Sequence, residues 1–230
     1  MSTATSRIRP AAIPPLENGD VLTRQEFERR YDAMPELKKA ELLEGEVYMG
    51  SPVGDEHGTS HSYLGYILTG YAIGTPGVQP CDNTIVRLTE ASMPQPDLFL
   101  MVKPENGGRM RRGEGRILDG VPELAAEIAV SSASIDANRK RRVYERAGVV
   151  EYVLWRVEDE ALDWLVLREG RYEELAPSAD GILRSEAFPG LWLDREALLR
   201  GDMARVQAVA QQGLAAPEHA AFVERLNRPR

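Results

Sequence analysis

Two stretches of the chain read as buried strands that each contain a single acidic residue. The run 124–130 is apolar except for Glu127, and the run 94–102 is apolar except for Gln95 and Asp97. Short apolar runs bounded by turn residues are typical of strands inside a sheet. Because a buried charge is costly unless it has a partner, these two acids are the first candidates for a functional site.

Other alternations of apolar and polar residues predict further strands. A hairpin is expected over 37–50 with its turn at Glu44-Gly45, and a strand pair is expected over 77–88, with the second strand over 83–88. A polar loop is expected over 103–116, which holds four glycines and four arginines. The remaining strands are expected over 149–157, 161–167, 171–175 and 181–185.

Helical spacing and capping residues predict the helices. The first begins at Thr23, three residues before Glu26, which is the spacing of a capping box. Residues 202–226 read as two helices broken at 213–217, and we expect this Ala-rich extension to serve packing or self-association. In chain order, helices are expected over 23–32, 56–72, 135–147 and 202–226.

Composition excludes several classes of protein. The chain of 230 residues carries a net charge of −8, which argues against coating nucleic acid through bulk positive charge but leaves local basic patches open. The lone cysteine, Cys81, excludes an internal disulfide framework and a cysteine-based zinc site. The chain has neither a membrane-length apolar run nor a secretory leader, so we expect a cytoplasmic protein without membrane partners.

The two acids suggest metal chemistry. Mg²⁺ prefers hard oxygen ligands and usually takes one or two protein carboxylates, so Asp97 and Glu127 together suit a Mg²⁺ (or Mn²⁺) site. A nearby ammonium, such as that of Lys140, can share in activating a water or stabilising charge on a phosphoryl oxygen. Asp136 and Lys140 stand four residues apart and therefore share one face of the predicted helix.

A series of short motifs strengthens this interpretation. The motifs are Ala40-Glu-Leu-Leu-Glu-Gly-Glu46, Ser51-Pro52, His57-Gly58, Pro96-Asp97, the run 122–131, the run 136–152 and Phe188-Pro-Gly-Leu191. Their order and spacing resemble the Uma2 family (DUF820), which belongs to the PD-(D/E)XK, restriction-endonuclease-like superfamily. The resemblance extends over about residues 22–197.

This resemblance implies an α/β (α+β) fold, with a central mixed β-sheet flanked by helices. The expected organisation is a flexible arm over 1–20, a restriction-endonuclease-like domain over 21–200 and a helical extension over 201–230.

The resemblance also assigns roles to individual residues. Asp97 is the acid of the PD motif and Glu127 is the acid of the (D/E)XK motif, so these two are the implied metal ligands. The lysine of the superfamily should stand two residues after Glu127, where this chain has Ala129. In this family the lysine moves to the following helix, which gives Lys140, and Glu41 is the implied additional acid.

Each candidate also has a purely structural interpretation. Asp97 could end a strand, and Glu127 could pair with an arginine. Lys140 lies in a basic run whose default is a solvated helix face, and Glu41 could face solvent as strand carboxylates commonly do. For three further groups of residues the sequence favours a structural role over a catalytic one. His57 and His61 are expected to be capping or surface residues, and Ser131, Ser132 and Ser134 to form a turn and cap a helix. The aromatic residues Tyr144, Tyr152, Trp155 and Trp164 are expected in the core.

The sequence thus predicts a Mg²⁺-dependent, endonuclease-like phosphodiesterase acting on DNA. Basic clusters at 109–116 and 139–146 would hold phosphates, unless they are a mobile loop and a solvated helix face. One alternative is an inactive nuclease-fold binding or assembly module, which Ala129 and the negative charge favour. Another is a metal-dependent hydrolase of a small phosphorylated substrate. A homodimer is expected, because the apolar extension at 202–226 needs a surface to cover it.

Overall fold

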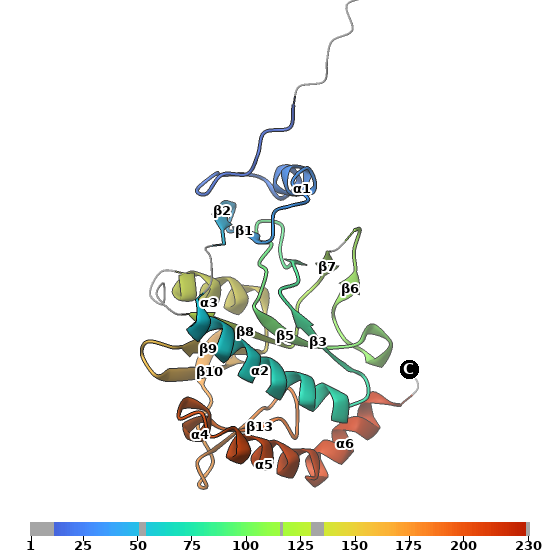
Figure 1. The fold of residues 1–230 in the computed structure, drawn as a ribbon. Coiled ribbons are helices and arrows are strands. Elements are labelled where there is room, and N and C mark those ends of the chain that lie inside the picture. Colours follow the sequence, from blue (N-terminus) through green and yellow to red (C-terminus); the bar gives the residue numbers. More distant parts are fainter. Residues whose placement is uncertain (1–11, 51–53, 116, 130–135, 229–230) are drawn as a thin grey trace, which may run out of the picture.

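The centre of the molecule is a six-stranded sheet in the order β11-β10-β9-β8-β5-β3 (Figure 1). The computed structural model describes residues 12–50, 54–115, 117–129 and 136–228. β8 and β9 run parallel and the other neighbours antiparallel, so the expected mixed sheet is confirmed. The strands are β3 (Val78–Asp82), β5 (Leu98–Val102), β8 (Leu124–Ala129), β9 (Glu151–Arg156), β10 (Ala161–Arg168) and β11 (Arg171–Glu174).

Helices cover both faces of this sheet. Alternate residues of a strand point to opposite faces, and in β5 Leu98 and Leu100 pack in the core beneath α2 (Asp55–Gly74). Phe99 instead packs in the core beneath α3 (Asp136–Ala147). Since α3 connects the parallel strands β8 and β9, it is the crossover that such a pair requires.

A smaller unit stands above one end of the sheet (Figure 1). It contains α1 (Arg24–Asp32) and the hairpin of β1 (Ala40–Leu43) and β2 (Glu46–Met49) around a core of its own. Glu44 and Gly45 both have positive φ, 54° and 85°, as a tight two-residue hairpin turn requires. The predicted hairpin and the Thr23 cap, whose side chain accepts from the Glu26 amide, are both confirmed.

The strand pair predicted over 77–88 is wrong. β3 pairs with β5 at the edge of the main sheet, whereas β4 (Val86–Arg87) pairs with β7 (Leu118–Asp119) in a separate three-stranded sheet. Asn83 has a left-handed φ of 44° and turns the chain away between the two strands. Pro80 lacks an amide proton, which suits β3 to an edge position.

Two further expectations need correction. The loop predicted over 103–116 contains a short 3₁₀ helix, η1 (Pro104–Asn106), and strand β6 (Arg111–Arg112), which pairs with β7. The strand expected near 181–185, β12 (Ile182–Arg184), does not extend the main sheet. It pairs with β13 (Trp192–Asp194), which the pattern did not predict because it has only three residues.

The C-terminal helices are α4 (Arg195–Leu199), α5 (Met203–Leu214) and α6 (Pro217–Leu226). Val206, Phe222 and Leu226 are buried in the same core as α2. The apolar side of the extension is therefore covered by the chain itself, which removes the reason for expecting a homodimer. The homodimer and the domain boundaries stay predictions. In the part of the chain that the structure describes, no helix has the length and apolar character needed to span a membrane.

Candidate active site

The four predicted site residues lie together at one end of the sheet. Asp97 directly precedes β5, Glu127 is in β8, Glu41 is in β1 and Lys140 is in α3. All four are buried, with exposed fractions of 4%, 5%, 6% and 8% respectively. Four charged residues at this level of burial are unusual, because charged side chains are almost never fully buried unless they are paired.

Strand register brings Asp97 and Glu127 to the same face of the sheet. Leu98 lies opposite Ala126 in the antiparallel pair of β5 and β8, and one more step of this register places Asp97 opposite Glu127. Directly opposed residues share a face and have Cβ atoms about 4.5–5.5 Å apart. The Asp97 carboxylate also accepts from the Ile128 amide at 2.9 Å, which fixes it beside β8.

Lys140 connects two of the carboxylates. Its Nζ lies 3.1 Å from Glu127 Oε2 and 3.0 Å from Glu41 Oε1. Glu41 also accepts from the Gln95 amide at 2.7 Å, so its carboxylate points inward. The solvated interpretations of Glu41 and Lys140 are therefore wrong, and Glu127 pairs with a lysine rather than with an arginine.

Sequence reasoning missed two residues around Asp97. Lys39 Nζ lies 2.8 Å from Asp97 Oδ1, and His57 Nε2 lies 3.5 Å from Oδ2. Lys39 stands two residues before Glu41, so strand alternation could have indicated that both face the same side. His57 is not the helix cap, since Gly54 holds that position at the start of α2, and its side chain is only 15% exposed.

Tyr144 also belongs to the site. It is buried as predicted, but its hydroxyl donates to Glu127 Oε1 at 2.7 Å, so both oxygens of that carboxylate are engaged. Lys140 and Tyr144 stand four residues apart on α3, a spacing that places them on one helix face. That spacing was the available signal. The side chain of Asp136 and the serines of 131–134 lie outside the described residues.

Burial and neighbouring charges determine the ionisation of the cluster. Burial raises the pKa of Glu127 to about 7, and the Lys140 ammonium opposes this rise. Burial alone would raise the pKa of Asp97, but His57, Lys39 and Lys140 together hold that pKa below its ordinary value. For Lys140, burial would lower the pKa, but the carboxylates of Glu127 and Glu41 outweigh it and raise the pKa well above its usual range.

The chemical type of the ligand atoms in the cluster suits a divalent cation. Glu41, Asp97 and Glu127 offer hard carboxylate oxygens, which Mg²⁺ and Mn²⁺ prefer. These three carboxyl groups face two ammonium groups, so one negative charge remains when all are ionised. Gln95, next to Glu41, keeps a buried side-chain oxygen without a donor among the described atoms. An orphaned buried acceptor of this kind suits a water or a cation.

Lysine ammonium groups nevertheless occupy the positions next to these carboxylates where a cation would bind. Among the described residues, no group of three or more His, Cys, Asp and Glu side chains is arranged to hold a metal ion. The Lys140 ammonium lies between Glu41 and Glu127, and Lys39 engages Asp97. A cation that joins Asp97 and Glu127 therefore requires the ammonium groups to shift.

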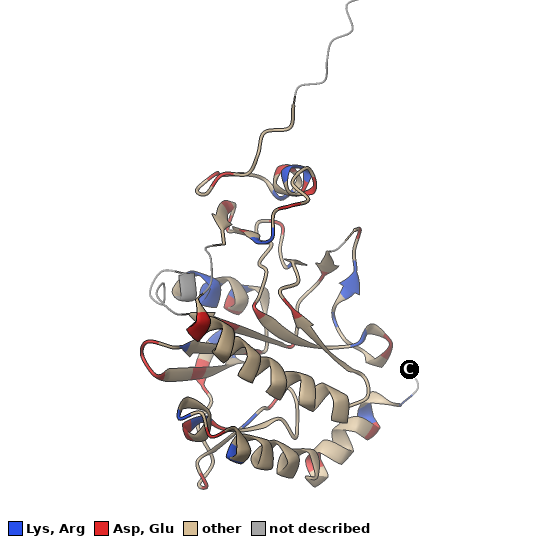
Figure 2. Ribbon diagram, in the orientation of Figure 1, with Lys and Arg blue, Asp and Glu red and all other residues tan. Residues whose placement is uncertain are grey.

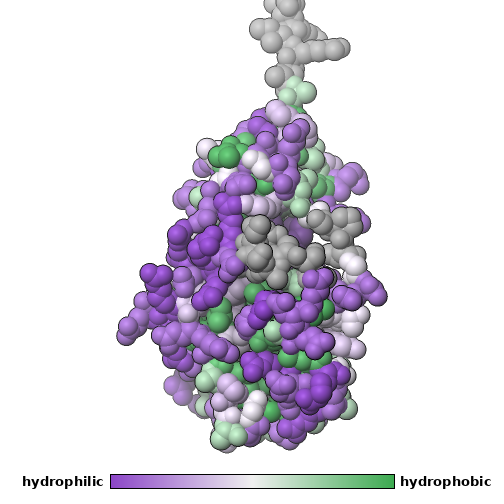
Figure 3. Space-filling view, turned by 90° about the vertical axis from the view of Figure 1, so that its left-hand side faces the viewer, coloured by the Kyte–Doolittle hydropathy of each residue, from purple (hydrophilic) through white to green (hydrophobic). Residues whose placement is uncertain are grey.

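The predicted basic clusters divide into two groups (Figure 2). Arg139 and Arg146 pair with Glu46 and Glu44 and so tie α3 to the hairpin. Four arginines are exposed and leave positive charge on β6 and α3, namely Arg111, Arg112, Arg141 and Arg142. The side of the molecule drawn in Figure 3 is mainly hydrophilic, with hydrophobic residues in separate patches.

Comparison with known proteins gives the chain a family. A crystal structure described as "a putative nuclease belonging to DUF820", from Anabaena variabilis ATCC 29413, matches 66% of this chain and 88% of that one, with a TM-score of 0.52 and 13% identity. At that identity the likeness shows the fold alone. No curated protein matches the chain. The Uma2 family model, described as "Putative restriction endonuclease", matches residues 24–196, and the chain therefore belongs to the Uma2 family.

Proposed function

We propose that this protein is a divalent-metal-dependent, endonuclease-like phosphodiesterase that acts on DNA. The observation that carries the proposal is the buried cluster at one end of the sheet, in which Asp97 lies beside Glu41 and Glu127, the two carboxylates that the Lys140 ammonium connects. Membership of the Uma2 family supports the same activity.

Asp97 and Glu127 are the residues that would hold Mg²⁺ or Mn²⁺. When bound there, such an ion supplies positive charge to a phosphoryl oxygen and lowers the pKa of an attacking water. Lys140 contributes a fixed positive charge, because two carboxylates within 3.1 Å keep its amine protonated. We therefore assign it to stabilising charge on the phosphate rather than to accepting a proton. Tyr144 holds the Glu127 carboxylate in place.

DNA binding by an acidic protein needs local positive charge near the cluster. Exposed arginines on α3, the helix that carries Lys140, supply it, among them Arg141 and Arg142. Phosphate contacts of this kind position a duplex without reading its sequence. The proposed enzyme thus holds the DNA backbone through these arginines while the scissile phosphate reaches the carboxylates.

Plasmid cleavage tests this proposal. The wild-type protein should cut supercoiled plasmid in Mg²⁺ or Mn²⁺, and Asp97→Asn should reduce the rate about a hundredfold or more, the size expected for loss of a transition-state group. Glu173→Gln, at an exposed acid on the edge strand β11, three strands away from β8, is the matched control and should cut like the wild type. Equal rates for wild type and Asp97→Asn would show a contaminating nuclease and remove the proposal.

A second candidate function is a binding module with a nuclease fold and no catalysis. Two observations favour it. The position of the superfamily lysine is Ala129, and Lys140 already neutralises Glu41 and Glu127. A calorimetric titration with Mn²⁺ separates the two functions. Absence of Asp97-dependent heat, together with absence of cleavage, would select the binding module.

A further inference from the structure

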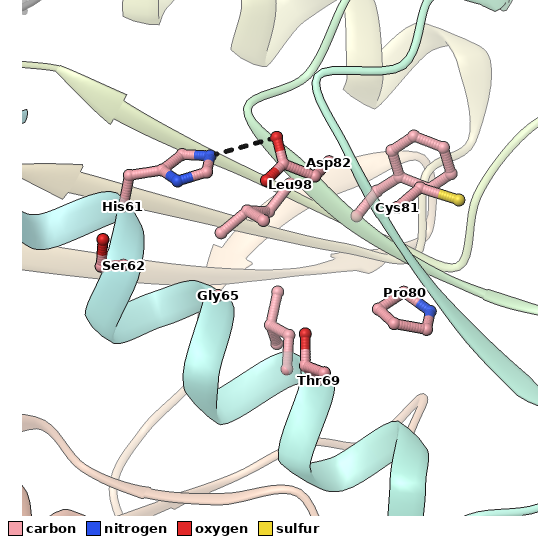
Figure 4. A pocket seen from close by; sticks show the side chains of 10 residues that line it. His61, Ser62, Gly65, Thr69, Pro80, Cys81, Asp82 and Leu98 are labelled. Atoms are coloured by element: carbon pink, nitrogen blue, oxygen red, sulfur yellow. Dashed lines mark ion pairs between the residues drawn. The ribbon is translucent and has the colours of Figure 1, made fainter. Parts of the chain in front are cut away.

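A pocket of about 400 Å³ lies between α2 and the edge strand β3, outside the carboxylate cluster (Figure 4). Its size is within the range of small-molecule sites, about 300–1,000 Å³. One side of α2 forms one wall, and β3 with the start of β5 forms the other. The lining residues are His61, Ser62, Gly65, Leu68, Thr69, Pro80, Cys81, Asp82, Leu98 and Phe99.

His61 joins this pocket to the carboxylate cluster. Its Nε2 lies 3.2 Å from the backbone oxygen of Asp97 and 3.5 Å from Asp82 Oδ1 (Figure 4). One turn earlier on α2, the ring of His57 stacks on that of His61, with centroids 6.0 Å apart, and reaches the Asp97 carboxylate. A ligand in the pocket therefore lies next to the proposed reaction centre.

If the cluster acts on nucleic acid, the ligand next to it is a nucleotide, and the charge of the pocket lining indicates which part of that nucleotide lies in the pocket. Lysine and arginine are absent from the lining residues, and an acid, Asp82, is present. A phosphate would be repelled there, whereas the carboxylate cluster nearby has the ammonium groups of Lys39 and Lys140 and, under the proposed function, a divalent cation that makes its net charge positive. The phosphate therefore belongs at the cluster, and a neutral group belongs in the pocket.

The shape and polarity of the lining suit a nucleobase. Leu68, Leu98 and Pro80 supply apolar surface for a flat ring. Asp82, whose side chain is 62% exposed, supplies a carboxylate acceptor. Its Oδ1 already accepts from the Asn83 amide group at 2.7 Å, so Oδ2 is the oxygen left for a ligand among the described residues. Carboxylates in nucleic-acid complexes accept from the exocyclic amino group of a base.

We propose that the pocket between α2 and β3 binds an amino-bearing nucleobase of the nucleotide whose phosphate lies at the carboxylate cluster. Cytosine, adenine and guanine carry the amino group, and thymine does not. This inference rests on the proposed function, since it takes the cluster to be a phosphate site, and it adds a base preference to that function.

Calorimetric titration of the full-length protein with dCMP and dTMP tests the pocket directly. We expect dCMP to bind about tenfold more tightly, because one charge-assisted hydrogen bond is worth roughly that factor. Asp82→Ala should abolish the difference, and Glu173→Ala, at an equally exposed acid on the opposite edge strand β11, should preserve it. Thr69→Trp should fill the pocket and weaken both ligands, whereas Ile73→Trp, at an 80% exposed position of the same helix, should not.

The outcomes separate this proposal from the proposed function. The proposal that the pocket binds a base would be overturned, even if plasmid is cleaved, by either of two results. One is that no mononucleotide binds, and the other is a dCMP preference that survives Asp82→Ala. A preference that requires Asp82 supports the pocket even if no plasmid is cleaved. Tighter binding of oligodeoxycytidine than of dCMP would identify a nucleic-acid strand as the source of the base. Equal binding would identify a free nucleotide, with the pocket itself supported in both cases.

Discussion

At the scale of single residues, the cluster takes Glu41 and Glu127 from strands, Asp97 from the residue before a strand, and Lys140 from a helix. Ala129 stands two residues after Glu127 and has no side chain that could reach a phosphate. Under the proposed function, the positive charge comes instead from Lys140 on α3, whose Nζ lies 3.1 Å from Glu127 Oε2. Because Lys140 reaches the acids from α3, the packing of this helix determines whether the cluster forms.

The hydrogen bond from Tyr144 to Glu127 gives a prediction at this scale. Tyr144→Phe should lower the free energy of unfolding by about 1.5–3 kcal/mol, the range for a hydrogen bond to a charged group. Tyr172→Phe removes an equally buried bond to a neutral acceptor, the Val149 carbonyl, and should cost only about 0.5–1.5 kcal/mol. Urea denaturation of both variants measures the difference. Equal losses would mean that Tyr144 does not support a charged partner.

At the scale of elements, local signals predicted most of the helices and strands. The cap at Thr23 and the turn at Glu44-Gly45 depend on residues that are neighbours in sequence, and both are observed. The pairing of β3 and β4 was predicted wrongly, because partner choice depends on contacts distant in sequence. Val78–Asp82 finds its partner in β5, beyond the turn at Asn83.

The residues of the site also divide into those with a local sequence signal and those whose contacts are distant in sequence. Asp97 and Glu127 could be singled out because each is a lone acid in an apolar run. His57 could not, and strand alternation could place Lys39 only on the same side as Glu41. Nothing adjacent in sequence shows that the start of α2 and the residue before β1 both reach Asp97. Their roles follow from tertiary packing, which brings those elements to one end of the sheet.

Asp194 joins α4 to α5 and gives a pH-dependent prediction. Burial would raise its pKa, but the Ala197 amide and Arg205 outweigh this and lower it. A depressed folded-state pKa contributes stability above the unfolded pKa, about 3.9, and that contribution is lost as pH falls through the folded pKa.

Asp194→Asn isolates this charge, because asparagine caps a helix about as well as aspartate. We expect the variant to be less stable than the wild type by about 0.5–1 kcal/mol at pH 7. The two proteins should converge as the pH falls below the unfolded pKa, about 3.9, and through the folded-state pKa of Asp194. Guanidinium denaturation across this pH range measures the difference, and a constant difference would exclude the ion pair as its source.

At the scale of the whole molecule, one continuous core joins the sheet, α2 and the C-terminal helices. Phe222 of α6 meets Phe188 edge-on, with ring centroids 6.3 Å apart, although the two are distant in sequence. The C-terminal helices therefore stabilise the face of the sheet that carries α2, and with it the start of α2, where His57 lies. Loss of this packing should affect the site as well as stability.

Phe222→Ala tests that packing. Deletion of a buried phenylalanine ring costs about 3–5 kcal/mol, and we expect a loss of that size. Ile73→Ala, at an 80% exposed position, should change stability by less than about 0.5 kcal/mol. Thermal and urea denaturation provide both values. A small effect of Phe222→Ala would show that α6 is not part of the common core.

The central claim is that Asp97 and Glu127 jointly bind a divalent cation. Anomalous diffraction from a crystal soaked in Mn²⁺ measures this most directly. We predict one strong peak within about 2 Å of an oxygen of each carboxylate, with the Lys140 ammonium moved from its place between Glu41 and Glu127. A crystal with no peak there, and with Lys140 still bridging the two glutamates, would contradict the account.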